Sequence, residues 1–297
     1  MASKRHAPLP PSFAGVFPLL DLPGAAVERV LESVSGREDR RALSLAFKRG
    51  RAAVDRGVVA IKGAGQYISQ AQISVLSGAS WRLQRLCLRN CQLGVEGVST
   101  LAPAAWPDLM QIILWHTNLG DAGAATLAAA DWPCLDSIDL SGCGLGLPGV
   151  AALAAAAWPR LKTLTINSNG LGDQSAAVLV AGTWTALETL HLGNNCIGSE
   201  GAAALAAGTW ICLTTLVLAR NDLGAAGAAV LAAAKFAKLW SLDVSRNHLG
   251  DNGAAALMAI NCPNLTVLHL QYDNISTGGE AALAAAASGR LRLQLRV

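Results

Sequence analysis

The chain has 297 residues, of which 52% are hydrophobic and only 14% are charged, with a formal net charge of +3. A globular chain of this length divides, as a rule, into about two domains. No run of about 18 or more apolar residues is free of charge, proline or glycine, so a membrane-spanning helix is not predicted. The small net charge gives no reason to expect nucleic acid as a partner.

Residues 1–18 form a proline-rich segment that we predict to be disordered. The apolar stretch 13–20 is short and broken, which argues against a secretory signal but leaves an organelle transit peptide open. Seven cysteines without a Cys-x-x-Cys pair favour reduced thiols and a cytoplasmic or nuclear location. The glycosylation sequons at Asn264 and Asn274 are then accidental.

Residues 19–57 show apolar residues at helical spacing in two stretches, which predicts a small helical hairpin. The segment resembles an F-box: Leu-Pro opens it, an apolar pair follows, and Asp39 precedes a second helix. The stretch 43–51 reads Leu-Ser-Leu-Ala-Phe-Lys-Arg-Gly-Arg and is similar to the family's Leu-Ser-Leu-Val-Cys-Lys-Arg-Trp-Arg, although Gly50 replaces its tryptophan. The resemblance implies docking to a Skp-type subunit through Leu22, Pro23, Val30, Leu31, Leu43 and Leu45. The alternative is a helical cap on the segment that follows.

Residues 83–290 contain eight copies of one 26-residue unit. Its first position holds Leu83, Leu109, Leu135, Leu161, Leu187, Leu213, Leu239 and Leu265. Its nineteenth position holds Leu101, Leu127, Leu153, Leu179, Leu205, Leu231, Leu257 and Leu283. Its twenty-fourth position holds Trp106, Trp132, Trp158, Trp184 and Trp210, then Phe236 and Cys262. Such a period indicates stacked units that share one core.

The spacing within the unit predicts strand, turn, helix and return. Leucines at positions 1, 4 and 6 bracket a short strand. Position 9 turns inward and holds Asn in four copies, where a buried amide can satisfy backbone groups of the loop. Glycine at position 12 supports a tight turn, and the Gly-Ala-Ala-x-Leu-Ala run predicts a helix. The Trp-Pro pair is expected to end that helix, since proline disfavours helix at the preceding residue.

The unit resembles the leucine-rich repeat, and the match covers about residues 58–297. Cys91 and Cys143 at position 9 are similar to the cysteine-containing subclass, whereas the Gly-Ala-Ala run resembles the ribonuclease-inhibitor and GALA-type subclasses. The resemblance implies an α/β solenoid with a curved parallel sheet on its concave face and helices on its convex face. We expect a degraded first unit over 58–82, one residue short, and a capping strand over 291–297.

Three motifs that suggest chemistry are better explained by the repeat. The GxGxxG match at 144–149 uses glycines at repeat positions and lacks a Rossmann unit. Asp243 and His269 occupy position 5 of adjacent units, about 5 Å apart with Ser245 nearby, but an open sheet offers no oxyanion donors. Cys87 is predicted to face the concave surface and Cys91 the turn, so they do not share a metal. We predict no cofactor, no metal and no enzymatic activity.

Positions 2, 3, 5, 7 and 8 are those that the fold leaves free, so recognition is expected there. The middle units place small or polar residues at these positions: Ser137, Asp139, Ser141, Thr163, Thr165, Asn167, Thr189 and His191. The N-terminal end carries Arg85, Arg89, Met110, Trp115 and His116, and the C-terminal end Arg220, Trp240, Asp243, Arg246, His269 and Tyr272. Trp, Tyr and Arg dominate interface energetics, which favours a protein contact at each end. Scattered surface aromatics without a role are the alternative.

Together these features predict a protein–protein interaction adaptor, monomeric outside its complex. The F-box resemblance implies the substrate-recognition subunit of a Skp/cullin/F-box-type ubiquitin ligase. A stand-alone scaffold or inhibitor like ribonuclease inhibitor, or a GTPase-activating repeat protein, are the alternatives.

Overall fold

A computed structural model of the chain describes residues 59–64, 73–74, 77, 83–260, 262–286 and 292–294. The predicted tail 1–18 and helical segment 19–57 lie outside these residues. The same holds for the six residues proposed for Skp-type docking, Leu22, Pro23, Val30, Leu31, Leu43 and Leu45.

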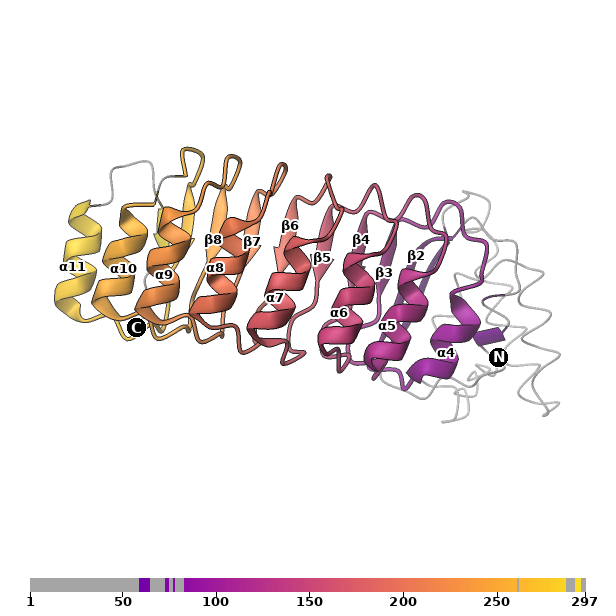
Figure 1. The fold of residues 1–297 in the computed structure, drawn as a ribbon. Coiled ribbons are helices and arrows are strands. Elements are labelled where there is room, and N and C mark those ends of the chain that lie inside the picture. Colours follow the sequence, from indigo (N-terminus) through magenta and orange to yellow (C-terminus); the bar gives the residue numbers. More distant parts are fainter. Residues whose placement is uncertain are drawn as a thin grey trace, which may run out of the picture.

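The described strands form one parallel sheet, in chain order from β1 to β10 (Figure 1). They are β1 (Val59–Ala64), β2 (Leu83–Arg89), β3 (Gln111–Ile113), β4 (Ser137–Asp139), β5 (Thr163–Thr165), β6 (Thr189–His191), β7 (Thr215–Val217), β8 (Ser241–Asp243), β9 (Val267–His269) and β10 (Arg292–Gln294). Equivalent positions of neighbouring units face each other, as Leu164 faces Leu190. Ile61 faces Leu86, so β1 precedes β2 by one residue less than the repeat length.

The helices cover one face of this sheet (Figure 1). They are α4 (Gly94–Leu101), α5 (Gly120–Ala128), α6 (Leu147–Ala154), α7 (Gly172–Val180), α8 (Ser199–Ala207), α9 (Gly224–Ala233), α10 (Gly250–Met258) and α11 (Thr277–Ala286). In the part of the chain that the structure describes, no helix has the length and apolar character to span a membrane.

The helices end earlier than the sequence suggested. The helix α5 ends at Ala128, whereas Trp132 and Pro133 follow in the return segment, so the prediction that Trp-Pro ends the helix is wrong. The physical reason is burial: the chain must leave the helix for the indole of Trp132, which is only 1% exposed, to reach the core.

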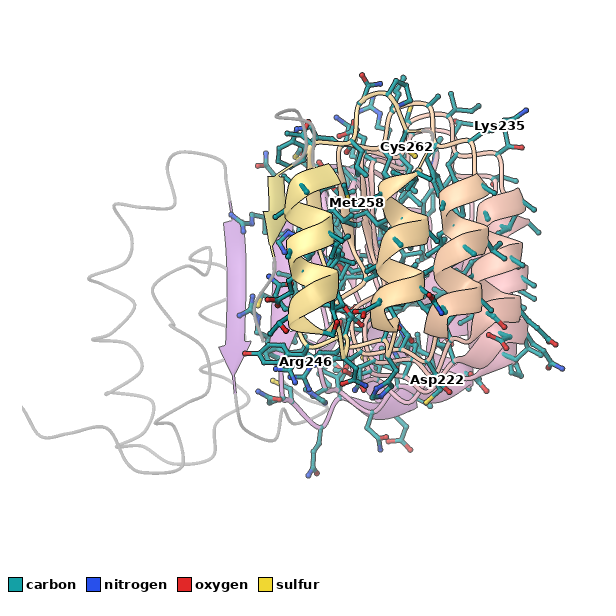
Figure 2. All side chains as sticks on the ribbon, turned by 90° about the vertical axis from the view of Figure 1, so that its left-hand side faces the viewer. Asp222, Lys235, Arg246, Met258 and Cys262 are labelled. Carbon is teal, nitrogen blue, oxygen red and sulfur yellow. The ribbon has the colours of Figure 1, made fainter. Side chains whose placement is uncertain are left out.

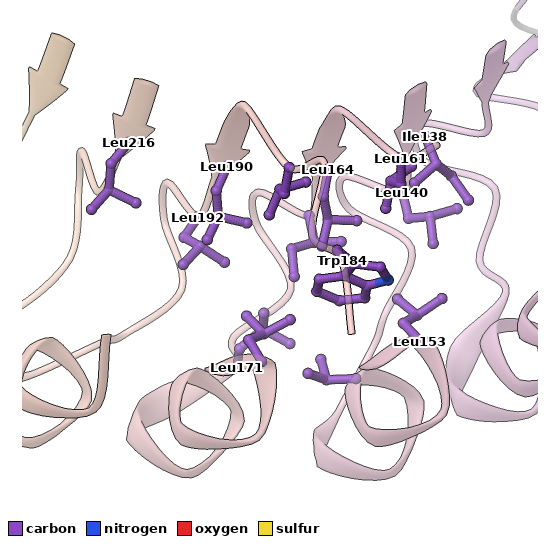
Figure 3. Packing of buried hydrophobic residues seen from close by; sticks show 14 of the residues in the cluster. Ile138, Leu140, Leu153, Leu161, Leu164, Leu171, Trp184, Leu190, Leu192 and Leu216 are labelled. Atoms are coloured by element: carbon purple, nitrogen blue, oxygen red, sulfur yellow. The ribbon is translucent and has the colours of Figure 1, made fainter. Parts of the chain in front are cut away.

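The core fills the space between the two layers. Leucines, isoleucines and one valine at positions 1, 4 and 6 are buried from the sheet side, and position 19 is buried from the helix side. Figure 3 shows Trp184 between the layers, with Leu164 on the sheet side and Leu153 on the helix side. Each buried leucine stabilises the fold by about 2 kcal/mol. Every unit buries its apolar face only against its neighbours, as a solenoid requires.

A ladder of buried amides runs along position 9, just beyond the strands. Asn221 shows the pattern: its Oδ1 accepts the backbone N–H groups of Asn195 and Ile197, both at 3.0 Å. Its Nδ2 donates to the carbonyls of Leu192 at 2.9 Å and Leu218 at 2.8 Å. Asn169 and Asn247 likewise satisfy backbone groups of their own unit and of the preceding one, and Asn195 satisfies groups of the preceding unit.

Asp273 ends this ladder in place of an asparagine. Its side chain is 1% exposed, and Oδ1 accepts the backbone N–H of Asn247. Oδ2 has no hydrogen-bond partner in the described residues, and it stands where asparagine would place its donor. Burial, the largest cause, raises the pKa of Asp273 to about 6 from its usual 3.8. A neutral carboxyl can donate where a carboxylate cannot.

Other carboxylates join helix to helix. Asp173, at the start of α7, accepts the backbone N–H groups of Gly198 at 2.6 Å and Gly201 at 2.9 Å, at the start of α8. Asp121 binds Gly146 and Gly149 of the next unit in the same way. A carboxylate at a helix N-terminus satisfies otherwise unpaired donors and complements the helix dipole. Here the cap comes from the preceding unit, which fixes the spacing between helices.

We expect Asn221→Ala to lower the free energy of unfolding by about 3 kcal/mol, because three buried backbone groups lose their partner, while the carbonyl of Leu218 keeps its bond from Asn247. Urea unfolding followed by circular dichroism measures this change. Thr126→Ala, which alters a partly exposed helix residue, serves as the control and should shift stability by less than about 0.5 kcal/mol. Equal losses in the two variants would contradict the structural role of the ladder.

We expect Asp273→Asn to change how stability depends on pH. The raised pKa means that the folded chain binds the proton more tightly, so the free energy of unfolding of the wild type falls as pH rises between about 4 and 6. Asparagine removes this decline and should raise stability at pH 7.5 by about 2 kcal/mol. Thermal unfolding at pH 4.5 and 7.5 tests this, with the exposed Asp131→Asn as control. A decline that persists in Asp273→Asn would show that another group causes it.

Candidate functional site

The candidate site is the sheet face that carries no helices, together with the edge where the strands end. Because side chains alternate along a strand, positions 4 and 6 face the core and positions 3, 5 and 7 face outward. No second layer covers this outward face within the described residues. The site therefore consists of rows that run across the strands, each row holding one repeat position.

The middle units of this face carry mainly polar side chains. Position 3 contributes the hydroxyl side chains of Ser137, Thr163, Thr189, Thr215 and Ser241. At position 5, His191 has its pKa lowered, chiefly by burial, although the carboxylates of Asp139 and Asp243 oppose this effect. The imidazole is therefore mainly neutral at pH 7.

The Ser/His/Asp set has a geometry of its own. Asp243 lies directly across from His269 on the neighbouring strand. The Oγ of Ser245 donates to Oδ1 of Asp243 at 2.6 Å, and the backbone N–H of Ser245 donates to the same oxygen at 3.0 Å. A nucleophilic serine would instead donate to the histidine. The same Asp-Ser pairing recurs at Asp139 and Ser141, which marks it as a feature of the strand end.

Cys87 in β2 and Cys91 just after it point in different directions, as predicted. Cys87 is half-buried on the outward face, whereas Cys91 is 1% exposed and its thiol donates to the carbonyl of Arg89. Among the described residues, no group of three or more histidines, cysteines or acids has the arrangement of a metal site.

The predicted N-terminal anchors include one aromatic pair and one arginine that is bonded along the sheet. Trp115, 39% exposed, packs against His116 with ring centroids 5.1 Å apart. The imidazole of His116 also lies over Gly142, where any Cβ atom would collide with the ring. Arg85 donates from Nε to Oε1 of Gln111 at 2.8 Å, which holds its guanidinium along the sheet.

The residues predicted as anchors at the C-terminal end do not form one cluster, because they lie toward two opposite edges of the sheet. The guanidinium of Arg246 lies 4.0 Å above the ring of Tyr272, at the edge where the strands end. Figure 2 shows Arg246 and Asp222 at that edge, and Lys235 and Cys262 at the opposite one. Trp240 precedes its strand and so lies toward the opposite edge from Arg246. Arg220 occupies the same repeat position as Arg246, one unit earlier.

The strand-end edge has an unusual backbone, which sequence reasoning did not detect. Positions 8 and 10 of most units have positive φ, the left-handed region that glycine and asparagine tolerate best. At position 8 the other units hold Asn90, Gly142, Ser168 and Asn194, whereas four units hold His116, Arg220, Arg246 and Tyr272. The glycine and asparagines at this position were the available signal. A bulky residue in this conformation destabilises the folded state by about 1 kcal/mol. These four side chains therefore stand at positions where the backbone favours glycine or asparagine.

Comparison with known proteins agrees with the repeat architecture. A family model described as Leucine Rich repeat matches residues 133–154, 185–206, 211–232 and 237–258. The chain therefore contains leucine-rich repeats, and its sheet and helices form a leucine-rich-repeat solenoid. Such repeats, with one sheet face open, support a role in protein interaction.

No match is found among curated proteins. One similar solved structure is titled "Crystal structure of Rad7 and Elc1 complex in yeast". It shares 17% sequence identity, with 91% of this chain and 87% of that chain covered, at a TM-score of 0.47. A likeness of this degree says nothing of function.

We expect Arg220→Asn to raise the free energy of unfolding by about 1 kcal/mol, because asparagine relieves the strain at a φ of 59°. Arg220→Lys, which keeps a long side chain in the same conformation, is the matched control and should leave stability unchanged. Thermal unfolding of the three proteins measures both effects. A stability loss in Arg220→Asn would mean that the arginine side chain supports the fold.

Proposed function

We propose that this protein is a non-catalytic adaptor that holds a target protein on the open sheet face and its strand-end edge. The observation that carries the proposal is the placement of large side chains. Trp115, Trp240 and Tyr272 are 39%, 51% and 50% exposed, whereas the middle units carry mainly small polar groups on the open face. Exposed aromatic and arginine side chains are those that contribute most to protein interfaces.

The shape of the face supports a protein target over a small molecule. Small-molecule sites are concave and largely apolar. The outward side chains of the middle units are instead mostly polar, and those at position 3 are half-buried hydroxyl groups. A protein that spans the sheet would contact the anchors at both ends and lie over the polar middle. We infer that binding depends on anchors from both ends.

We further propose that the N-terminal segment joins the adaptor to a ubiquitin ligase through a Skp-type subunit. The support is the F-box resemblance of residues 19–57, with Leu31 in the apolar pair of the first predicted helix. The cytoplasm or the nucleus would be the place of action, with the chain monomeric outside its complex.

A pull-down of the full chain with a purified Skp-type subunit tests the adaptor role. We expect the wild type to bind and Leu31→Asp to lose at least tenfold in affinity, because a carboxylate cannot enter an apolar interface without a large desolvation cost. Circular dichroism of both proteins must show the same repeat fold. Failure of the folded wild type to bind would reject the ligase role. Target binding that survives deletion of residues 1–57 would then favour a stand-alone scaffold or inhibitor.

A further inference from the structure

We propose that Arg220, Arg246 and Tyr272 form a docking site for an acidic segment of the protein partner. The proposal rests on the proposed function and adds the chemistry of the ligand. These residues occupy position 8 in three consecutive units, so their backbones follow one another along the strand-end edge at the strand spacing of about 5 Å.

The geometry of Arg246 suits carboxylate recognition. Its guanidinium lies 4.0 Å over the ring of Tyr272, and both side chains are exposed. The contact with the ring restrains the exposed guanidinium, whose N–H groups can donate two parallel hydrogen bonds to a carboxylate. A second guanidinium from Arg220, one unit away, can take a neighbouring acidic side chain.

The charges of both arginines are not neutralised by their surroundings. Within the part of the chain that the structure describes, no carboxylate lies within salt-bridge distance of Arg220 or Arg246; the described ion pair joins Lys162 and Glu188. Asp243, on the strand that leads to Arg246, is engaged by Ser245. Asp222 is exposed at position 10 of the same unit as Arg220. The two arginines thus form a local site for anions on an otherwise acidic array of repeats.

The backbone supplies an independent argument. The φ angles of Arg220, Arg246 and Tyr272 are 59°, 61° and 58°, in a region where Asn90 and Asn194 stand at the same position of other units. Strained residues of this kind concentrate at functional sites, where the surroundings impose them. Asparagine suits this conformation better than arginine or tyrosine, so the backbone gives no reason for these three side chains, and we ascribe them to binding.

A protein segment fits this site better than a nucleic acid. Residues 83–286 contain more acidic than basic side chains. A long polyanion would meet Asp139 and Asp243 on the open face as well as the two arginines, whereas short acidic groups need contact only the edge. Arginine rather than lysine at both positions also favours planar, bidentate recognition.

Selection from a random peptide display library on the full-length chain tests the proposal and needs no purified target protein. We expect enriched peptides to carry Asp or Glu in at least two nearby positions. Binding of one such peptide, measured by fluorescence anisotropy, should weaken at least tenfold in Arg220→Asn and in Arg246→Asn. Arg160→Asn, an exposed arginine outside the site, is the control and should bind like the wild type.

The variants separate binding from folding, because Arg220→Asn is expected to be more stable than the wild type while it binds less. Selected peptides without acidic enrichment, or with affinity unchanged in both variants, would overturn the inference and leave the proposed function intact. Failure to select any peptide would contradict both. Tighter binding of a single-stranded oligonucleotide than of the acidic peptide, lost in the same variants, would overturn the inference in favour of nucleic acid.

Discussion

The buried hydrogen-bond ladder at position 9 is the constraint on which the rest of the architecture depends. Where each strand ends, the chain must turn toward the helix layer, and its backbone groups pass into a region without water. The amides of Asn195, Asn221 and Asn247 satisfy such groups in the preceding unit, and those of Asn221 and Asn247 also do so in their own unit. Unpaired backbone groups at this depth would cost about 1–3 kcal/mol each, which would remove much of the stability of a unit.

The same ladder shapes the surface proposed for recognition. Where position 9 points inward, the chain adopts a left-handed conformation at position 8 and, in most units, also at position 10. Glycine and asparagine satisfy that demand at little cost, and several units use them. Arg246 and Tyr272 do so with strain, and the nearby Asp273 carries an unsatisfied buried oxygen. The C-terminal units therefore combine an unsatisfied buried carboxyl oxygen with large side chains in a strained backbone conformation, which indicates that stability there is reduced in favour of another requirement.

Much of the fold was accessible from the pattern of particular residues. The leucine lattices predicted the core, and the tryptophans at position 24 proved to be largely buried. The end of the helix was misplaced, because proline after Trp132 suggested a stop signal where the real cause is the path of the indole into the core. The set of anchors at the C-terminal end was taken as one cluster, but Trp240 and Arg246 lie toward opposite edges. Their closeness in sequence does not reveal this separation, because a strand of three residues lies between them and its two ends are at opposite edges of the sheet.

The sequence by itself determined the repeat, its period, the inward positions and the solenoid class, because each of these follows from the spacing of apolar residues that must share one core. Only the tertiary structure decided which free positions come together. The contact of Arg246 with Tyr272 links residues 26 apart through the register of two parallel strands, and the strain at position 8 arises from the turn that buries its neighbour. Both depend on packing between units, and no single unit contains that information.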